Sequence, residues 1–200
     1  MRTVRIAYAD PFRPFAWCEN GVHRGRFLDC LGALAAGANV ALRLVPGPMQ
    51  DLPLWLGRGE IDAIAPQAIV PQRAGRFVFS RPLMETSAAL FGPRGSVPPL
   101  VGEAGTARIA TPVSGPLAEM LPALAPNCLV VGTSDYEDSL RAVANGIADW
   151  AALNADAGAE LAAEWRSGAI GARGAPFARI GLAVAVRPGD PNGVLAALGL

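Results

Sequence analysis

An arginine two residues after a proline is the most informative candidate for chemistry in this sequence. Arg73 follows Pro71 and Gln72, and a short apolar run over residues 61–65 precedes them. Proline suits the first position of a helix, because its fixed φ is already helical and its missing N–H is not needed there. The unpaired N–H groups of a helix start and an arginine guanidinium both attract negative charge. The spacing therefore predicts a site for a small carboxylate, with Arg73 as its clamp.

Alternating strand and helix patterns surround this site and predict an α/β fold. A helix is expected to begin at Pro71, and a glycine-rich loop is expected over residues 167–176. Strands are expected at residues 4–8, 39–45, 61–65, 108–111, 128–131, 150–153 and 180–186, and helices at 27–37, 48–58, 136–145 and 157–165, with another from Leu117. In an open α/β sheet, ligands bind at the carboxyl ends of the strands. The loops after these strands are therefore expected to carry the site.

Three motifs resemble the signature of the family 3 extracellular solute-binding proteins. They are Gly-Glu-Ile-Asp at residues 59–62, Ile-Val-Pro-Gln-Arg-Ala at 69–74 and Phe-Ser-Arg-Pro-Leu at 79–83. The flanking stretches 6–15, 21–34 and 181–191 extend the resemblance over nearly the whole chain. Members of this family are receptors that deliver amino acids to ABC importers. The resemblance implies a two-lobed type 2 periplasmic-binding-protein-like α/β fold, with a ligand cleft between the lobes.

The resemblance also implies a domain plan. Lobe 1 is expected over residues 1–90 and lobe 2 over residues 91–200, with hinge crossings near 88–93 and 180–187. The family's C-terminal helix, which returns to the first lobe, is shortened here, so a homodimer or a rearranged C-terminus is expected to cover the apolar surface left behind. Gly-Ile-Ala-Asp at residues 146–149 echoes residues 59–62, which predicts two lobes of similar plan.

Further ligand contacts in the first lobe follow from the resemblance alone. An aromatic residue at the position of Phe12 stacks on the ligand in the family, and Asp10 belongs to the same loop. The neighbouring Phe15 and Trp17 are also cleft candidates, although packing in the core is the simpler interpretation.

The predicted pocket is less polar than is usual in the family. Gln67 and Ala68 stand where small hydroxyl-bearing residues often line the ligand loop.

In the second lobe, the resemblance points to the starts of two helices. Ser114 and Gly115 stand where the receptors offer a hydroxyl and backbone N–H groups to an anion, but Ser114 suits a plain helix cap equally well. Asn154 stands where receptors for α-amino acids place an aspartate that binds the ammonium. Asp156 could replace that charge if it turns inward. An ordinary α-amino acid is therefore not the expected ligand.

Two other functions compete with solute binding. One is an enzyme on the same scaffold that resembles the cyclohexadienyl dehydratases, which are lyases; Asp10, Glu19 and Glu85 are its candidate general acids. Cys18 as a nucleophile lacks an activating neighbour. His23, the only histidine, is expected in an exposed loop and is assigned no role. The other is an intracellular sensor domain, for which no DNA-binding segment is found.

Composition excludes several classes of function. All 17 basic residues are arginines and none is a lysine, which excludes a lysine Schiff base and a Walker-type lysine. The arginines form no cluster typical of nucleic-acid or membrane binding. The 3 cysteines have no metal-ligand spacing, and no cofactor motif or membrane-spanning apolar run is found.

The expected partners are a small-molecule carboxylate and an ABC transporter permease. No signal peptide is recognised at the start, which predicts a cytoplasmic protein if the sequence is full length and a periplasmic or extracellular one if a signal was removed.

Overall fold

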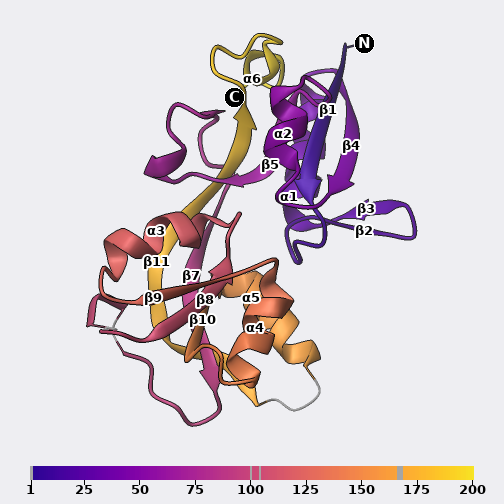
Figure 1. Cartoon of the computed structure of the whole chain (residues 1–200). Helices are drawn as coiled ribbons and strands as arrows, with labels where there is room; N and C mark the ends of the chain where they lie inside the picture. Colours follow the sequence, from indigo (N-terminus) through magenta and orange to yellow (C-terminus); the bar gives the residue numbers. More distant parts are fainter. Residues whose placement is uncertain (1, 100, 104, 166–168) are drawn as a thin grey trace. The chain divides into compact units, whose positions relative to one another are not determined.

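The computed structural model describes residues 2–99, 101–103, 105–165 and 169–200 of a mixed α/β protein (Figure 1). Its contacts divide the chain into two compact units: unit 1 is Met1–Glu85 with Gly181–Leu200, and unit 2 is Thr86–Ile180. The boundaries fall inside two long strands, β7 (Met84–Pro93) and β11 (Ile170–Val186). This division differs from the expected assignment of residues 91–200 to lobe 2, because residues 181–200 belong to unit 1.

Unit 1 is built on parallel strands. Its other elements are β1 (Arg2–Ala9), β2 (Trp17–Glu19), β3 (Val22–Arg24), α1 (Arg26–Gly37), β4 (Val40–Gly47), α2 (Leu52–Gly57), β5 (Ala63–Ala68), the 3₁₀ turn η1 (Pro71–Arg73), β6 (Val78–Phe79) and α6 (Val194–Ala197). The strand order is β4-β1-β5-β11, and β6 also pairs with β11. β1 runs parallel to β4 and β5, whereas β11 is antiparallel to β5.

The core of unit 1 follows the predicted apolar pattern. Ile6, Ala7 and Tyr8 of β1 are buried, as expected for a strand covered on both faces. α1 buries Phe27, Leu28, Leu31 and Ala35, the helical spacing that the sequence predicted. The two strands and the helix expected over residues 4–45 are thus confirmed, and the β2–β3 hairpin is an element that the sequence did not predict. That hairpin turns at Asn20 and Gly21, whose φ angles of 52° and 76° suit a tight primed turn.

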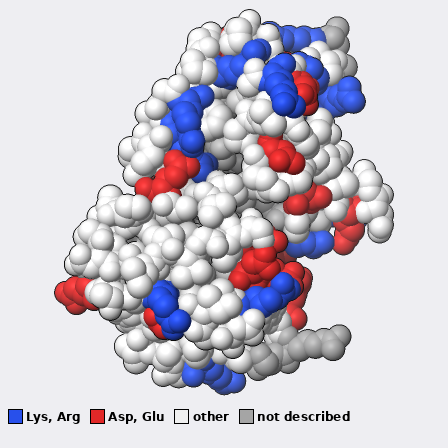
Figure 2. All heavy atoms as spheres, in the orientation of Figure 1, with Lys and Arg blue, Asp and Glu red and all other residues white. Residues whose placement is uncertain are grey.

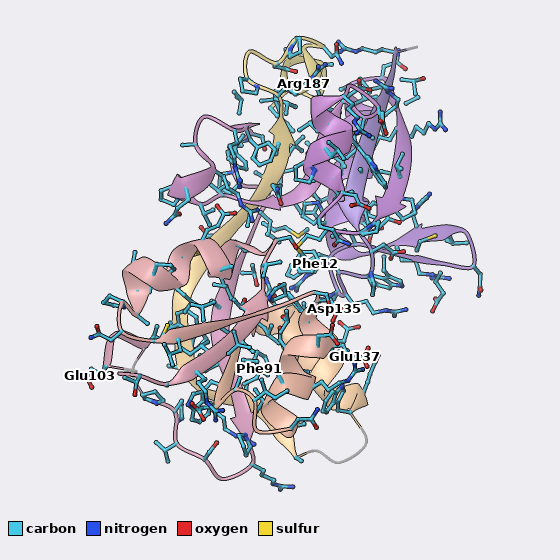
Figure 3. The ribbon with its side chains drawn as sticks, in the orientation of Figure 1. Phe12, Phe91, Glu103, Asp135, Glu137 and Arg187 are labelled. Carbon is cyan, nitrogen blue, oxygen red and sulfur yellow. The ribbon has the colours of Figure 1, made fainter. Side chains whose placement is uncertain are left out.

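Unit 2 repeats this plan with its own elements. They are β7, η2 (Val101–Glu103), β8 (Arg108–Pro112), α3 (Pro116–Leu124), β9 (Leu129–Thr133), α4 (Tyr136–Ala144), β10 (Trp150–Asn154), α5 (Ala155–Glu164) and β11. The strand order is β7-β10-β8-β9, with β8 parallel to both β9 and β10. Phe91 of β7 is fully buried and α5 lies close to its ring (Figure 3). A Cβ on Gly158 of α5 would lie 2.6 Å from that ring, so only glycine permits this approach.

One loop prediction was wrong in part. Ser167 and Gly168 lie outside the described residues, but from Ile170 the chain already belongs to β11. The glycines that suggested a loop, Gly171 and Gly174, are accommodated in this long strand.

Matching arginine–aspartate pairs confirm that the similar sequences at residues 59–62 and 146–149 occupy equivalent places in the two units. In unit 1, Arg5 of β1 donates to Asp62 through Nε (3.0 Å) and Nη2 (2.8 Å) and also reaches the Gly59 carbonyl. In unit 2, Arg108 of β8 donates in the same way to Asp149, at 3.3 and 2.6 Å, and to the Gly146 carbonyl. Each pair ties the first strand of a β-α-β-α-β unit to the turn before its third strand.

The C-terminal segment packs onto unit 1. Asp190 caps α6 by accepting hydrogen bonds from the backbone N–H groups of Val194 and Leu195. Val194 and Leu198 are buried, and Asn192 donates to Asp62 at 2.8 Å. Residues 188–200 therefore cover part of unit 1, the role that the sequence had left to a rearranged C-terminus or a dimer.

Candidate functional site

Arg73, the predicted clamp, is only 3% exposed and lies in the turn that follows β5. The turn is held by backbone hydrogen bonds from Arg73 N to Val70 O (3.0 Å) and from Phe77 N to Arg73 O (3.2 Å). The helix expected to begin at Pro71 is instead a single 3₁₀ turn of 3 residues. So short a turn has too few aligned peptides for an appreciable dipole. Of the two features that the sequence offered for an anion, the guanidinium and the helix start, the guanidinium therefore remains as the candidate.

Gln67 and Ala68 are strand residues rather than loop residues. Both belong to β5 and pair with Ala183 and Leu182 of β11. Ala68 is buried and Gln67 is half-buried. The Ile69 N–H donates to the Gly181 carbonyl at 2.9 Å, which continues the pairing toward the Arg73 turn. The backbones of these two residues thus help to position the turn that carries Arg73.

The loop after β1 is closed by its own polar and aromatic groups. Asp10 Oδ1 accepts from the Cys18 N–H at 2.9 Å, so this carboxylate ties the two ends of the loop together. The half-buried Phe12 lies beside Phe15, with ring centroids 5.0 Å apart, and Figure 3 shows it in this loop. Phe15 is fully buried, which confirms the interpretation that it packs in the core.

The Trp17 side chain packs against an arginine and also has a buried indole N–H. The Arg13 guanidinium lies 4.7 Å from the centroid of its ring, a cation–π contact. Its Nε1 is buried, and no hydrogen-bond partner is found for it within the described part of the chain.

The candidate acids of the enzyme alternative belong to different elements: Asp10 follows β1, Glu19 ends β2 and Glu85 lies in β7. Glu19 lies in the β2–β3 hairpin with its carboxylate 3.3 Å from both Arg13 and Arg24. Glu85 is exposed and is the last residue of the first segment of unit 1, Met1–Glu85. Cys18 is half-buried and pairs with His23 across the hairpin. Of these groups, only Asp10 and Cys18 share a direct hydrogen bond.

A tyrosine that the sequence analysis passed over anchors His23. Tyr8 is fully buried and its hydroxyl lies 2.7 Å from His23 Nδ1. Burial, together with the nearby charge of Asp10, raises the pKa of Tyr8 well above its usual value. The phenol therefore stays protonated. His23 is exposed as predicted, but it lies in β3 rather than in a loop.

In unit 2, helix α3 begins after a glycine. Gly115 is the N-cap residue, and no side chain caps this helix. The alternative that Ser114 serves as a plain cap is therefore wrong. The Gly115 N–H donates to Pro112 O at 2.9 Å, and a Cβ there would lie 3.1 Å from the same oxygen. Gly115 thus permits a tight turn after β8, which places Ser114 at the carboxyl end of that strand.

Thr111 is a buried polar residue near this turn that the sequence analysis did not select. It is 1% exposed, and no residue in the described ranges offers its hydroxyl a hydrogen-bond partner. Its position at the end of β8, just before Ser114 and Gly115, was the available signal. Threonine is also common in strands, so the signal was not specific.

Asn154 stabilises the start of helix α5. It ends β10, caps α5, and is 4% exposed. Its Oδ1 accepts from Ala157 N at 3.1 Å and lies 3.3 Å from Thr86 Oγ1. Thr86 also donates to Asp156 Oδ2 at 2.6 Å. An aspartate at position 154 would therefore bring a second carboxylate to the same threonine hydroxyl, a like-charge contact that asparagine avoids.

Neither a metal centre nor a membrane-spanning helix is found in the described parts of the chain. No three His, Cys, Asp or Glu side chains there are grouped so that they could hold a metal ion. None of the helices described above has the length and apolar character needed to cross a membrane.

The arrangement of strands and helices defines a mixed α/β protein of the periplasmic-binding-protein kind. The family model of the bacterial extracellular solute-binding proteins, family 3, matches residues 4–198, and the chain belongs to this family. No curated protein matches the chain.

Several solved structures share the fold. A histidine kinase sensor domain with similarity to periplasmic binding proteins has a TM-score of 0.86 at 21% identity, covering 98% of this chain and 87% of its own. An ancestral arginine-binding protein bound to glutamine has a TM-score of 0.83 at 20% identity, covering 99% and 89%. The holo arginine-binding protein from T. maritima has a TM-score of 0.82 at 19% identity, covering 98% and 87%. At these identities the likeness establishes the fold alone.

Proposed function

We propose that this solute-binding protein binds a small carboxylate-bearing molecule, either amino-acid-like or an organic acid, and that Arg73 fixes the carboxylate. The burial of Arg73 in the turn after β5 is the observation that carries the proposal. The planar guanidinium donates two parallel hydrogen bonds to a carboxylate, and its low exposure strengthens them. Phe12, Gln67 and Ala68 of unit 1 are proposed as its neighbours in the site.

Ser114, Gly115 and Asn154 of unit 2 are proposed as further ligand contacts. Asn154 carries no charge, and the nearby Asp156 already accepts a hydrogen bond from Thr86. A ligand ammonium would therefore find weaker compensation at position 154 than at an aspartate, and Asp156, which stays negatively charged while it accepts from a neutral hydroxyl, would have to supply the compensation from two residues away. This favours an organic acid or a modified amino acid over an ordinary α-amino acid.

An ABC transporter permease is the proposed partner. Membership of the solute-binding family supports this, as does the structural likeness to the substrate-binding protein of an amino acid ABC transporter, with a TM-score of 0.80 at 18% identity.

The test is a ligand panel of amino acids, keto acids and dicarboxylates, read out as a rise in melting temperature and then by calorimetry. A ligand at 100 times its Kd should stabilise the folded protein by about 2.7 kcal/mol. Arg73→Ala should weaken binding of the best ligand by about 100-fold, because about 3 kcal/mol of charged hydrogen bonding is lost. The control is Arg76→Ala, which removes an exposed arginine from the same segment. Equal affinity of the Arg73→Ala protein would remove Arg73 from the site.

The same panel, extended to prephenate-like acids, tests the lyase alternative. Mass spectrometry of the incubated compounds distinguishes a ligand retained unchanged from a substrate consumed over many turnovers. Loss of water and carbon dioxide with turnover would replace the binding proposal by the lyase.

A further inference from the structure

Strand β9 is an edge of the unit 2 sheet. Within the described residues it pairs with β8 alone, in parallel register. The Leu129 N–H donates to the Ala107 carbonyl at 2.9 Å, and the Thr133 carbonyl accepts from the Val113 N–H at 3.0 Å. The backbone groups of Leu129 and Thr133 therefore face the β8 side of the strand.

The outer side of β9 presents the backbone groups of two residues. The N–H and C=O groups of one residue point to the same side of a strand, and those of the next residue point to the other side. Because Leu129 and Thr133 face β8, Val130 and Gly132 face outward. Both residues are exposed. Their N–H and C=O groups are therefore available to a further strand.

The edge strand β4 holds the equivalent place in unit 1. Its Arg43 pairs in the sheet register with Arg5, and Leu129 of β9 pairs with Arg108. Arg5 and Arg108 occupy equivalent places, because each binds the aspartate of the turn before the third strand of its unit. Arg43 is therefore the unit 1 counterpart of Leu129.

The two edges differ in the features that prevent strand addition. Three residues further along each strand, Pro46 of β4 corresponds to Gly132 of β9. Charged side chains and prolines protect an edge, and a proline has no N–H to donate. β4 thus has Arg43 and Pro46 at these two places. Residues 129–133 of β9 include neither a charged residue nor a proline, so the unit 2 edge accepts another strand.

Exposed apolar side chains lie beside the outward backbone groups. A Cβ on Gly132 would lie 2.5 Å from Val113 Cγ1, so the Val113 side chain lies over this glycine. Val113 is 65% exposed and Val130 is 42% exposed. A valine placed opposite Gly132 by an added strand would contact Val113 and bury apolar surface of both.

We propose that β9 pairs with β9 of a second copy of this chain, antiparallel and centred on Val131. Val130 then lies opposite Gly132 of the second copy, and the two residues exchange both of their backbone hydrogen bonds. The two-fold axis repeats this pair, so every outward N–H and C=O group finds a partner. Val130 of each copy contacts Val113 of the other. This interface lies in unit 2 and does not depend on the proposed carboxylate site.

The charges at the two ends of β9 favour a second copy in this orientation. Asp135, Glu137 and Asp138 follow the strand, whereas residues 125–128, which precede it, carry no charge. An antiparallel pair places the acidic end of one copy beside the uncharged end of the other. Like charges of the two copies are thus kept apart.

Sedimentation velocity of the ligand-free protein tests the proposal. The concentration should run from about 5 µM to about 1 mM, because so small an interface is expected to give a Kd of about 100 µM. We expect the mass to rise from 20.6 kDa toward twice that value. Over the same range, hydrogen exchange measured by NMR should slow several-fold at the Val130 and Gly132 amides, which become donors, and not at the Val131 amide, which already faces β8.

Two variants test the edge itself. Gly132→Pro gives β9 the proline of β4, and Val130→Arg places a charge in the interface; each should weaken dimerisation more than 10-fold. The matched control is Ile147→Arg, the same kind of substitution at an exposed apolar residue of unit 2 outside β9, and it should leave dimerisation unchanged. Circular dichroism and thermal melting verify that each variant is folded.

A protein that stays monomeric over the whole concentration range would overturn the proposal. A dimer that persists in the folded Val130→Arg protein, or that forms without slower exchange at Val130 and Gly132, uses another surface and would overturn it as well. If Gly132→Pro does not fold, Val130→Arg and the exchange measurement still decide.

Discussion

Thr111 lies in β8, the strand that leads to Ser114 and Gly115, and its hydroxyl is a buried polar group. It is buried at the end of β8 without a hydrogen-bond partner among the described residues. A buried hydroxyl in this condition costs about 1–3 kcal/mol. We expect Thr111→Val, which keeps the shape and removes the polar group, to raise the free energy of unfolding of the ligand-free protein by about 1 kcal/mol. Urea denaturation measures the change.

Thr133 on the neighbouring strand β9 provides the matched control. Its hydroxyl lies 2.6 Å from that of Ser139, so Thr133→Val should lower the stability by about 1 kcal/mol through loss of this hydrogen bond. If Thr111→Val is also destabilising, a bound water molecule serves the Thr111 hydroxyl. If the substitution is stabilising but weakens binding of the panel ligand, Thr111 joins Ser114 and Gly115 as a ligand contact.

At the scale of elements, the two arginine–aspartate pairs hold equivalent places but differ in burial. The Asp62 side chain is 11% exposed, whereas that of Asp149 is 41% exposed. Hydrogen bonds from Arg5 hold the pKa of Asp62 below its usual value, with its burial opposing the shift and the Arg5 charge and Asn192 adding to it. Hydrogen bonds from Arg108 likewise lower the pKa of Asp149.

This difference predicts a pH dependence. A lowered folded-state pKa means that the stabilising contribution is complete above the unfolded pKa of about 3.9 and is lost as the pH falls through the folded pKa. At pH 6 we expect Asp62→Asn to lower the free energy of unfolding by about 1 kcal/mol, a value reduced for the exposure of Arg5. Between pH 6 and pH 3 this variant should lose less stability than the original protein.

Asp149→Asn is the matched comparison in unit 2, and its effect should be smaller because water screens the more exposed pair. Denaturant titrations at several pH values measure both. Parallel pH profiles for the original protein and Asp62→Asn would contradict the assigned linkage.

The elements that the sequence predicted correctly are those with a strong periodic pattern. α1 and the strand β1 follow their apolar spacing closely, and the echo at residues 59–62 and 146–149 pointed to equivalent turns. Three features of the fold were not predicted from the sequence, because local sequence does not determine them. The strands of the β2–β3 hairpin are too short to show a period, the Pro71 turn ends after one 3₁₀ turn, and β11 extends through glycines. Tyr8 and Thr86 were missed as polar partners because their contacts come from distant parts of the chain.

At the scale of the whole molecule, charge is divided unequally although the total is zero. Unit 1 has 11 arginines against 8 aspartates and glutamates, a formal charge of +3, and unit 2 has 6 against 9, a formal charge of −3. On the face drawn in Figure 2, blue side chains gather over the end of unit 1 that contains α6 and the start of β1. A net positive unit that carries the proposed clamp Arg73 should attract anions before they make contact.

This charge division predicts a salt dependence of the binding rate. For an anionic ligand identified by the panel, raising sodium chloride from about 20 mM to about 300 mM should lower the association rate constant several-fold, since the screening length falls to less than 10 Å. The dissociation rate constant should change less, because short-range contacts within the site are screened less than long-range attraction. Stopped-flow fluorescence, with the four tryptophans as reporters, measures both rates.

A zwitterionic ligand without net charge is the control, and its association rate should depend little on salt. Arg76→Ala reduces the charge of unit 1 by one and should lower the association rate of the anion at low salt while leaving dissociation unchanged. Because Arg76 is exposed and Arg73 is buried, the two alanine variants separate long-range attraction from direct contact. If salt instead raises the dissociation rate and leaves association unchanged, the positive charge of unit 1 acts only within the bound complex.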